Sequence, residues 1–184
     1  WYYIKGLFER SLETYKVAET LDSDNPVVQA RLGKIYADKN QNNKAQAALE
    51  KAIRLNPKDA ESHYQLGKLV SGEGKWGRAQ SLLSNAIALD ARHGASYYEL
   101  GVVLLGRGNV DLAKDNFQKA LDLEPKNSGY IMGLAMALVE KKDLDSALEM
   151  LLPVSKGETR NPKILIAICM VYTKKGYFTA ATGY

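Results

Sequence analysis

The chain repeats its own pattern with a period of 34 residues, and this feature limits its possible folds more than any other. Residues 60–93 and 94–127 align without a gap, so that Leu66-Gly67 recurs as Leu100-Gly101. The same offset relates three further pairs: Gly74 and Gly108, Ala79 and Ala113, and Leu89 and Leu123. A fixed period of this size indicates stacked structural repeats, each of which buries its apolar face only against its neighbours.

The register extends over the whole chain. It gives a partial repeat at 1–25, four full repeats at 26–59, 60–93, 94–127 and 128–161, and a partial repeat at 162–184. Leu32-Gly33 and Leu134-Ala135 stand where the second repeat has Leu66-Gly67. We therefore expect a single domain over residues 1–184, all-α, with about five helix-turn-helix units that are partial at both ends.

Apolar residues inside each repeat follow helical spacing, and turn residues separate the helical stretches. This pattern predicts first helices at 26–39, 60–73, 94–107 and 128–141, and second helices at 42–55, 76–89 and 110–123. Pro26 and Pro162 suit the first position of a helix, and Asn25 suits the cap before it. A turn after the first helix is expected at four glycines, which are Gly6, Gly74, Gly108 and Gly176.

Two segments are expected to depart from the regular pattern. Before the first full repeat, a complete helix is predicted from about Leu7 to Leu21. In the fourth repeat, Pro153 falls inside the expected second helix, where proline removes a hydrogen bond and clashes with the preceding turn. We expect a kink or an early end near Leu152, followed by irregular chain at 156–160.

The repeat resembles the tetratricopeptide repeat (TPR) family, whose unit has 34 residues and forms a helix-turn-helix. The resemblance implies a right-handed α-solenoid without catalytic activity, in which partners bind as peptides or helices to a concave face. The regular units are similar to those of bacterial TPR proteins, which often help to assemble pili, secretion or envelope machinery. The chain begins without Met inside a first helix. We therefore expect a fragment of a longer protein. The sequence leaves its compartment open; for a bacterial protein, it is the cytoplasm or the periplasm.

In this family the second, fifth, ninth and twelfth positions of each repeat face the groove, with the sixth and thirteenth beside them. The partner-binding residues implied by the resemblance are Lys34, Tyr64, Lys68, Tyr98, Val102, Leu105, Met132, Gly133, Met136, Val139, Ile166 and Met170. Their N-terminal members are polar and partly basic, and their C-terminal members are apolar. We expect the apolar part to hold one side of an amphipathic segment and the lysines to favour acidic residues.

Gly129 and Gly133 are expected to leave room opposite Tyr98. The alternative is that further C-terminal repeats, or a tight superhelix, cover the apolar residues. Other uses of the segment also stay open: a scaffolding or regulatory arm of a larger enzyme or signalling protein, and self-association through Trp1-Tyr2-Tyr3 or the C-terminal face.

Chaperone-binding members of the family grip a C-terminal carboxylate with lysine, asparagine and arginine from three repeats. The matching positions here keep only Lys34 of that set, or only Lys68 if the match starts one repeat later, and Glu99 would repel a carboxylate in either case. Chaperone tails are therefore not expected as partners. The net charge is +4, and lysines alternate with acids, so nucleic acid is not expected either. No run of about 18 apolar residues suggests membrane insertion.

Catalysis, metal binding and cofactors find no support in the sequence. The two histidines stand apart, His63 in a packing position and His93 in a turn. Cys169 takes the small-residue position and is expected to be a buried small hydrophobe. No Cys-x-x-Cys or histidine pair offers metal ligands, and Gly72-Glu73-Gly74-Lys75 is read as a turn because it follows a helix.

Overall fold

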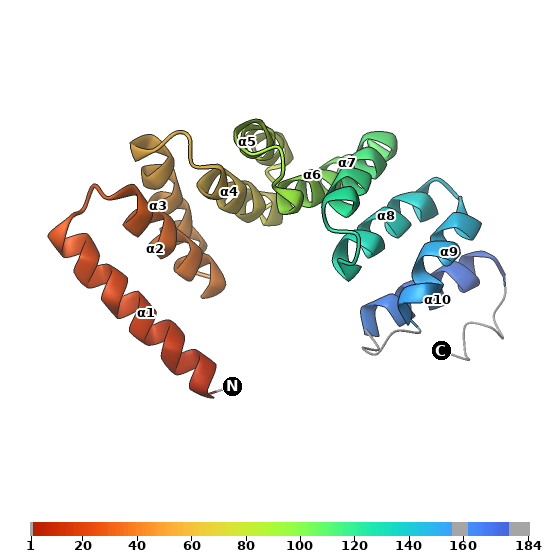
Figure 1. Cartoon of the computed structure of the whole chain (residues 1–184), viewed down its shortest axis with the longest axis horizontal. Coiled ribbons are helices and arrows are strands. Elements are labelled where there is room, and N and C mark those ends of the chain that lie inside the picture. The colour runs from red at the N-terminus through yellow and green to blue at the C-terminus, as the bar shows by residue number, and fades with distance from the viewer. Residues whose placement is uncertain (1, 156–161, 177–184) are drawn as a thin grey trace. The chain divides into compact units, whose positions relative to one another are not determined.

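A computed structural model describes the backbone of residues 2–155 and 162–176, and the side chains of these ranges from residue 9 onward. All regular secondary structure in these ranges is α-helical (Figure 1). The helices are α1 (Tyr2–Leu21), α2 (Pro26–Asp38), α3 (Asn42–Leu55), α4 (Ala60–Gly72), α5 (Trp76–Leu89), α6 (Gly94–Gly106), α7 (Val110–Leu123), α8 (Ser128–Glu140), α9 (Leu144–Ser155) and α10 (Pro162–Lys174). The predicted all-α class is confirmed.

The helix boundaries follow the 34-residue register. The helices α2, α4, α6, α8 and α10 each begin 34 residues after the last, and the predicted ranges up to residue 141 agree to within one residue. The Asn25 Oδ1 atom accepts hydrogen bonds from the amides of Val27 and Val28, at 3.0 and 3.3 Å. This cap satisfies amides that have no partner inside the helix, which explains why α2 begins there.

The turn inside each repeat requires a left-handed backbone at one fixed position. Gly74, Gly108 and Gly176 have φ angles of 75°, 78° and 82°, as the turn prediction requires. The other two repeats place Asn40 and Lys142 at this position, with φ angles of 56° and 63°. A Cβ atom makes this conformation costly, and asparagine tolerates it better than lysine does.

Two local predictions are wrong. The chain does not turn at Gly6, because α1 runs without a break from Tyr2 to Leu21. One glycine costs a helix only about 1 kcal/mol, which the rest of a 20-residue helix can offset. The early end of α9 near Leu152 is also not found, since the helix continues through Pro153 to Ser155. The alternative, a kink at this point, stays a prediction. Proline in the last turn removes a single backbone bond, the one to the carbonyl of Glu149. The irregular chain predicted at 156–160 lies outside the described residues.

The chain forms two compact bodies, residues 1–91 with α1 to α5 and residues 92–184 with α6 to α10. In the first body, a core cluster joins α1, α2 and α3, and its members are Leu12, Val28, Leu32, Ile35 and Ala48. In the second body, a core cluster joins α8, α9 and α10, and its members are Ala135, Ala147, Leu148, Leu151, Ile164, Ile168 and Val171. Each body thus builds its core from helices that follow one another in the chain.

The two helices of a repeat meet at a contact between a small and a large residue. A Cβ atom added to Gly33 would lie 2.5 Å from Cγ of Leu49, and one added to Gly67 would lie 2.9 Å from Cγ of Leu83. At Gly101 the added atom would lie 2.7 Å from the Phe117 ring. Because real Cβ contacts are never this short, the glycines let each pair of helices approach closely.

Exposed ion pairs repeat in the same register. Lys39 pairs with Glu9, Lys141 with Asp111, and Lys175 with Asp145. Each pair joins the start of a second helix, or its equivalent in α1, to the end of the next first helix. The Lys141 ammonium lowers the pKa of the Asp111 carboxyl and the carboxylate raises the pKa of Lys141 in return. Such pairs contribute little to stability because water and salt screen them.

The turn position provides a test of backbone strain. Lys142→Gly should raise the free energy of unfolding by about 0.5 kcal/mol, because relief of left-handed strain exceeds the entropy that glycine loses on folding. Asn40→Gly should gain less, since asparagine already tolerates the conformation. Gly108→Ala should lower the free energy of unfolding by about 1 kcal/mol, because the added Cβ atom introduces the left-handed strain that glycine avoids. Urea unfolding measures all three, and equal effects of Lys142→Gly and Gly108→Ala would contradict the strain argument.

Candidate protein-binding surfaces

The second body carries a hollow of about 350 Å³ between α6, α8 and α10. We call it the apolar pocket. It brings together five of the predicted binding residues, Val102, Leu105, Met136, Val139 and Met170. Met136 and Met170 are 50% and 59% exposed, so they lie at the mouth of the hollow. At one end, the Lys174 ammonium lies 3.7 Å from the Glu140 carboxylate, which adds the only ion pair among the lining residues that the structure describes.

Small residues on the first helices open the apolar pocket. Ala167 occupies the sixth position of its repeat, where earlier repeats have Arg31, Gln65 and Glu99. With only a methyl group at this position and at Ala135, the hollow reaches Leu151 and Val171. Sequence reasoning missed Ala167, Val171, Glu140 and Lys174. Ala167 could have been predicted from the sequence, because the side chain at the sixth position is much smaller there than in the first three full repeats.

Two residues predicted at the groove belong to the packing of the second body. Met132 is half-buried and packs against the core cluster of α8, α9 and α10. Gly133 is buried, and a Cβ atom there would lie 2.8 Å from the Phe117 ring and 2.9 Å from the Tyr98 ring. The room expected opposite Tyr98 is therefore filled by Tyr98 and Phe117 themselves. Gly133 allows this packing and offers no surface to a partner.

The aromatic residues around Gly133 pack against one another. Tyr98 lies with its ring centroid 5.3 Å from that of Tyr130 and 5.5 Å from that of Phe117. The Tyr130 hydroxyl donates to Glu124 at 3.3 Å. The pKa of Tyr130 is raised to about 12, mainly by burial and further by the charge and the hydrogen bond of Glu124. Burial also raises the pKa of Tyr98. Both phenols thus stay protonated at neutral pH, as packing groups do.

A second hollow lies along α10. It is lined by Leu165, Ile166, Cys169, Met170, Thr173 and Lys174. Ile166, another predicted binding residue, is 59% exposed here. Cys169 was expected to be buried, but it is only half-buried. The corresponding Gly33, Gly67, Gly101 and Ala135 are all buried under the second helix of their repeat.

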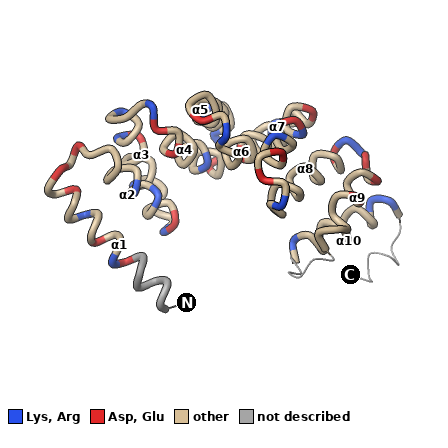
Figure 2. The backbone as a smooth tube through the Cα atoms, viewed as in Figure 1, with Lys and Arg blue, Asp and Glu red and all other residues tan. Residues whose placement is uncertain are grey.

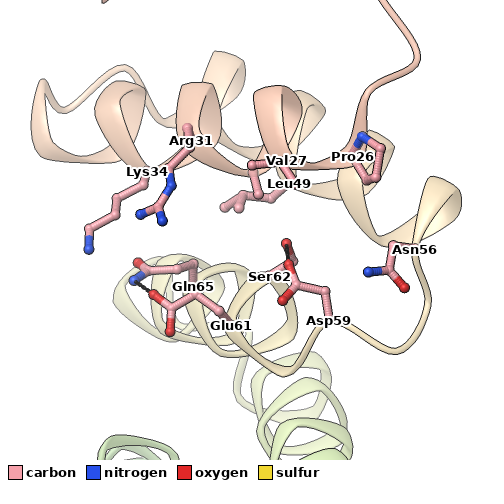
Figure 3. Close-up of a pocket in the computed structure, with 11 residues that line it drawn as sticks. Pro26, Val27, Arg31, Lys34, Leu49, Asn56, Asp59, Glu61, Ser62 and Gln65 are labelled. Carbon is pink, nitrogen blue, oxygen red and sulfur yellow. Dashed lines mark hydrogen bonds between the residues drawn. The ribbon is translucent and has the colours of Figure 1, made fainter. Parts of the chain in front are cut away.

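The first body has a hollow of different character, of about 220 Å³, between α2 and α4. We call it the polar pocket (Figure 3). Arg31 and Lys34 reach from α2 toward Gln65 and Glu61 on α4. The Gln65 amide donates to the Glu61 carboxylate at 2.6 Å, and Ser62 bonds to Asp59 on the far side of the hollow.

Other predicted or notable residues lie outside both pockets. Lys68 is exposed and Tyr64 half-buried on α4, and neither lines the polar pocket. His63 is buried, with Nε2 3.0 Å from the Pro57 carbonyl oxygen, which agrees with its predicted packing position. His93 caps α6 by accepting from the Ser96 amide at 3.2 Å. Within the polar pocket, by contrast, Asn56 and Asp59 are lining residues that the sequence did not predict, because they belong to a turn.

Charges of both signs alternate along the described backbone (Figure 2). The described part of the chain holds no group of three acidic, histidine or cysteine side chains that could bind a metal ion. None of the helices described here is both long and apolar enough to cross a membrane.

Comparison with known families gives a direct match. A TPR repeat model matches residues 33–74, and two tetratricopeptide repeat models match residues 64–128 and 104–169. Together they span residues 33–169 without a gap. The chain belongs to the tetratricopeptide repeat family. TPR proteins are protein-interaction scaffolds, and the fold is typically non-catalytic.

Solved TPR structures share the fold. PilW is described as a widely conserved type IV pilus biogenesis factor. It is 19% identical in sequence and has a TM-score of 0.89, and the match covers 99% of this chain and 85% of PilW. The pilF protein of Pseudomonas aeruginosa is 18% identical and has a TM-score of 0.83, and the match covers 100% of this chain and 83% of pilF. YrrB is described as a TPR protein with an unusual peptide-binding site. It is 20% identical and has a TM-score of 0.73, and the match covers 92% of this chain and 88% of YrrB. The α-solenoid class is thereby confirmed. The search of curated proteins finds no match.

The packing role of Gly133 can be tested by adding one methyl group. Gly133→Ala should lower the free energy of unfolding by about 1–3 kcal/mol, because the new Cβ atom overlaps two aromatic rings. Gly77→Ala is the matched control, since nothing lies within 4 Å of its added Cβ atom. That variant should be neutral or slightly stabilising, as alanine favours a helix. Equal unfolding midpoints for the two variants would show that Gly133 is not tightly packed.

Proposed function

We propose that this TPR segment binds the apolar side of an amphipathic partner segment in the apolar pocket. The observation that carries the proposal is the exposure of Met136 and Met170 at the mouth of a hollow lined by Val102, Leu105 and Val139. Exposed apolar surface of this kind in a water-soluble domain usually has a partner, because burying it is favourable.

The chemistry of the pocket supports an adaptable contact with a side chain or a helix face. Methionine has an unbranched, flexible side chain, which fits partners of different shape. A helix presents apolar groups on one face at intervals of three and four residues, which suits a hollow between parallel helices. The Glu140–Lys174 pair at one end can bond to a polar residue that flanks the apolar ones.

The polar pocket adds a preference for charge in the first body. Neither Arg31 nor Lys34 forms an ion pair with another described residue, and both reach over the hollow (Figure 3). We propose that they favour acidic residues in a partner. The Glu61 carboxylate beside them would repel a partner segment that carries several neighbouring acidic residues.

A role in the assembly of a bacterial multiprotein machine, such as a pilus, is our proposal for the process. It is supported by the likeness of fold to PilW, whose description names pilus biogenesis. The likeness concerns the fold, so the process has to be tested by identifying the partner.

The binding proposal is tested with displayed peptide libraries selected on the 184-residue chain. Selected peptides should carry apolar residues at helical spacing. Met136→Glu and Met170→Glu should each weaken their binding at least about 100-fold by calorimetry, because a carboxylate would be buried in an apolar hollow. Val17→Glu on α1, where Val17 is 60% exposed, is the control and should leave the affinity unchanged.

Two outcomes would contradict the proposal. One is a set of selected peptides without an apolar pattern, and the other is equal binding by the Met136→Glu and Val17→Glu variants. Met132→Glu is unsuitable for this test, because the half-buried Met132 packs against the core and the change would also reduce stability.

A further inference from the structure

The apolar pocket is deep as well as apolar. Its floor is formed by Leu151 and Val171, which are at most 2% exposed and belong to the interior of the second body. The hollow reaches this floor between Ala135 on α8 and Ala167 on α10, because neither methyl group closes the gap. A shallow groove would be enough to support the face of a helix. The additional depth gives room for one side chain that enters from the mouth.

The size of the hollow favours a fused aromatic ring over smaller side chains. A closed apolar cavity of about 150 Å³ is enough to hold a benzene ring. The apolar pocket has about 350 Å³, part of which lies at its open mouth. A leucine or phenylalanine side chain would leave space beneath it, and the atoms around an unfilled space lose contacts. The indole group of tryptophan is larger and fills more of the hollow.

The polar and sulfur atoms that line the hollow match the charge distribution of an indole group. An aromatic ring is negative on its face and positive at its edge, and the indole N–H is a donor at that edge. The Lys174 ammonium can lie over the ring face, and the Glu140 carboxylate can accept a hydrogen bond from the N–H. The thioethers of Met136 and Met170 make favourable contacts with a ring edge. A leucine side chain would gain none of these contacts.

The Glu140–Lys174 pair can rearrange at little cost to make the new contacts. The ammonium lies 3.7 Å from the carboxylate, so no short hydrogen bond holds the two groups together. The Lys174 side chain is 49% exposed and the Glu140 side chain 56%, and an ion pair with this exposure contributes little to stability. Both charges are therefore available to an indole group at this end of the hollow.

We propose that the apolar pocket holds the side chain of one tryptophan of the partner protein, with the indole ring over Leu151 and its N–H directed toward Glu140. This inference rests on the proposed function and adds the residue that determines which amphipathic segments bind. The other apolar residues of the segment would lie on Val102 and Leu105 of α6.

The test uses N-acetyl-tryptophanamide as the probe, because it carries the side chain without any partner sequence. A fluorinated derivative reports binding to the whole chain by fluorine NMR. Binding should saturate with a dissociation constant on the order of 1 mM, which is within the limit for a ligand of this size. N-acetyl-leucinamide should displace the probe at least about tenfold less well than unlabelled N-acetyl-tryptophanamide does, since it fills less of the hollow.

Ala167→Leu is the variant that closes the hollow, because its side chain extends into the gap between α8 and α10. It should abolish binding of the probe. The thermal unfolding midpoint should stay the same or rise, since filling a hollow adds contacts. Val17→Glu, on α1 in the first body, is the control and should bind the probe unchanged.

Glu140→Ala isolates the hydrogen bond of the indole N–H. It should weaken binding of the tryptophan probe about fivefold, because a bond to a charged acceptor is lost. A naphthylalanine probe has a fused ring of similar size without an N–H. Its affinity should be the same for the original chain and for the Glu140→Ala variant.

Four results would overturn the proposal. The first is no saturation of the probe up to about 10 mM, and the second is equal displacement by the tryptophan and leucine amides. The others are undiminished binding by Ala167→Leu, and an equal effect of Glu140→Ala on both probes. A dimer of the chain that the probe dissociates, measured by light scattering, would assign the pocket to a tryptophan of a second copy and overturn it too.

Failure of the proposed function gives a different result. In that case, peptides with apolar residues at helical spacing bind equally to the Met136→Glu and Val17→Glu variants, whatever the amide probes do. If Met136→Glu abolishes peptide binding while the tryptophan and leucine amides compete equally, the proposed function stands and only the preference for tryptophan is wrong.

Discussion

The close contact between a small residue on each first helix and a large one on the second is the constraint on which the other features depend. Because Gly33, Gly67 and Gly101 have no side chain, Leu49, Leu83 and Phe117 can lie directly against the facing backbone. This contact fixes the rotation of both helices about their axes. Once the rotation is fixed, the positions that face the hollows are determined, and they can vary without affecting the pairing.

Variation at the sixth position of the first helix accounts for much of the difference between the two pockets. Arg31 and Gln65 make the hollow of the first body polar, whereas Ala167 opens that of the second body down to Leu151. Gly133 occupies the same position but serves the interior, because Phe117 is larger than the leucines of other repeats and fills the space. The residue at this one position thus lines the polar pocket, packs in the interior or opens the apolar pocket, according to its own size and that of its neighbours.

The sequence predicted the helices almost completely, because the register repeats the same turn and cap signals. It predicted the surface less well. Five of the apolar residues named as partner-binding line the apolar pocket, and their binding role stays a prediction, whereas Met132 and Gly133 face neighbouring helices of the same body. A register transferred from other repeats cannot show that a larger ring at Phe117 needs room in α8. The turn predicted at Gly6 and the early end predicted for α9 at Pro153 are absent for a related reason, since the remainder of a helix can outweigh a single helix-breaking residue.

Among the described helices, each makes its substantial contacts only with the next helix or the one after it. The average separation along the chain between touching residues is therefore small, which is typical of proteins that fold within milliseconds or less. It also means that a substitution disturbs its own repeat and the adjacent ones, and little else. The polar pocket and the apolar pocket can consequently change independently during evolution, so that the binding preference proposed for one pocket can change while that proposed for the other is kept.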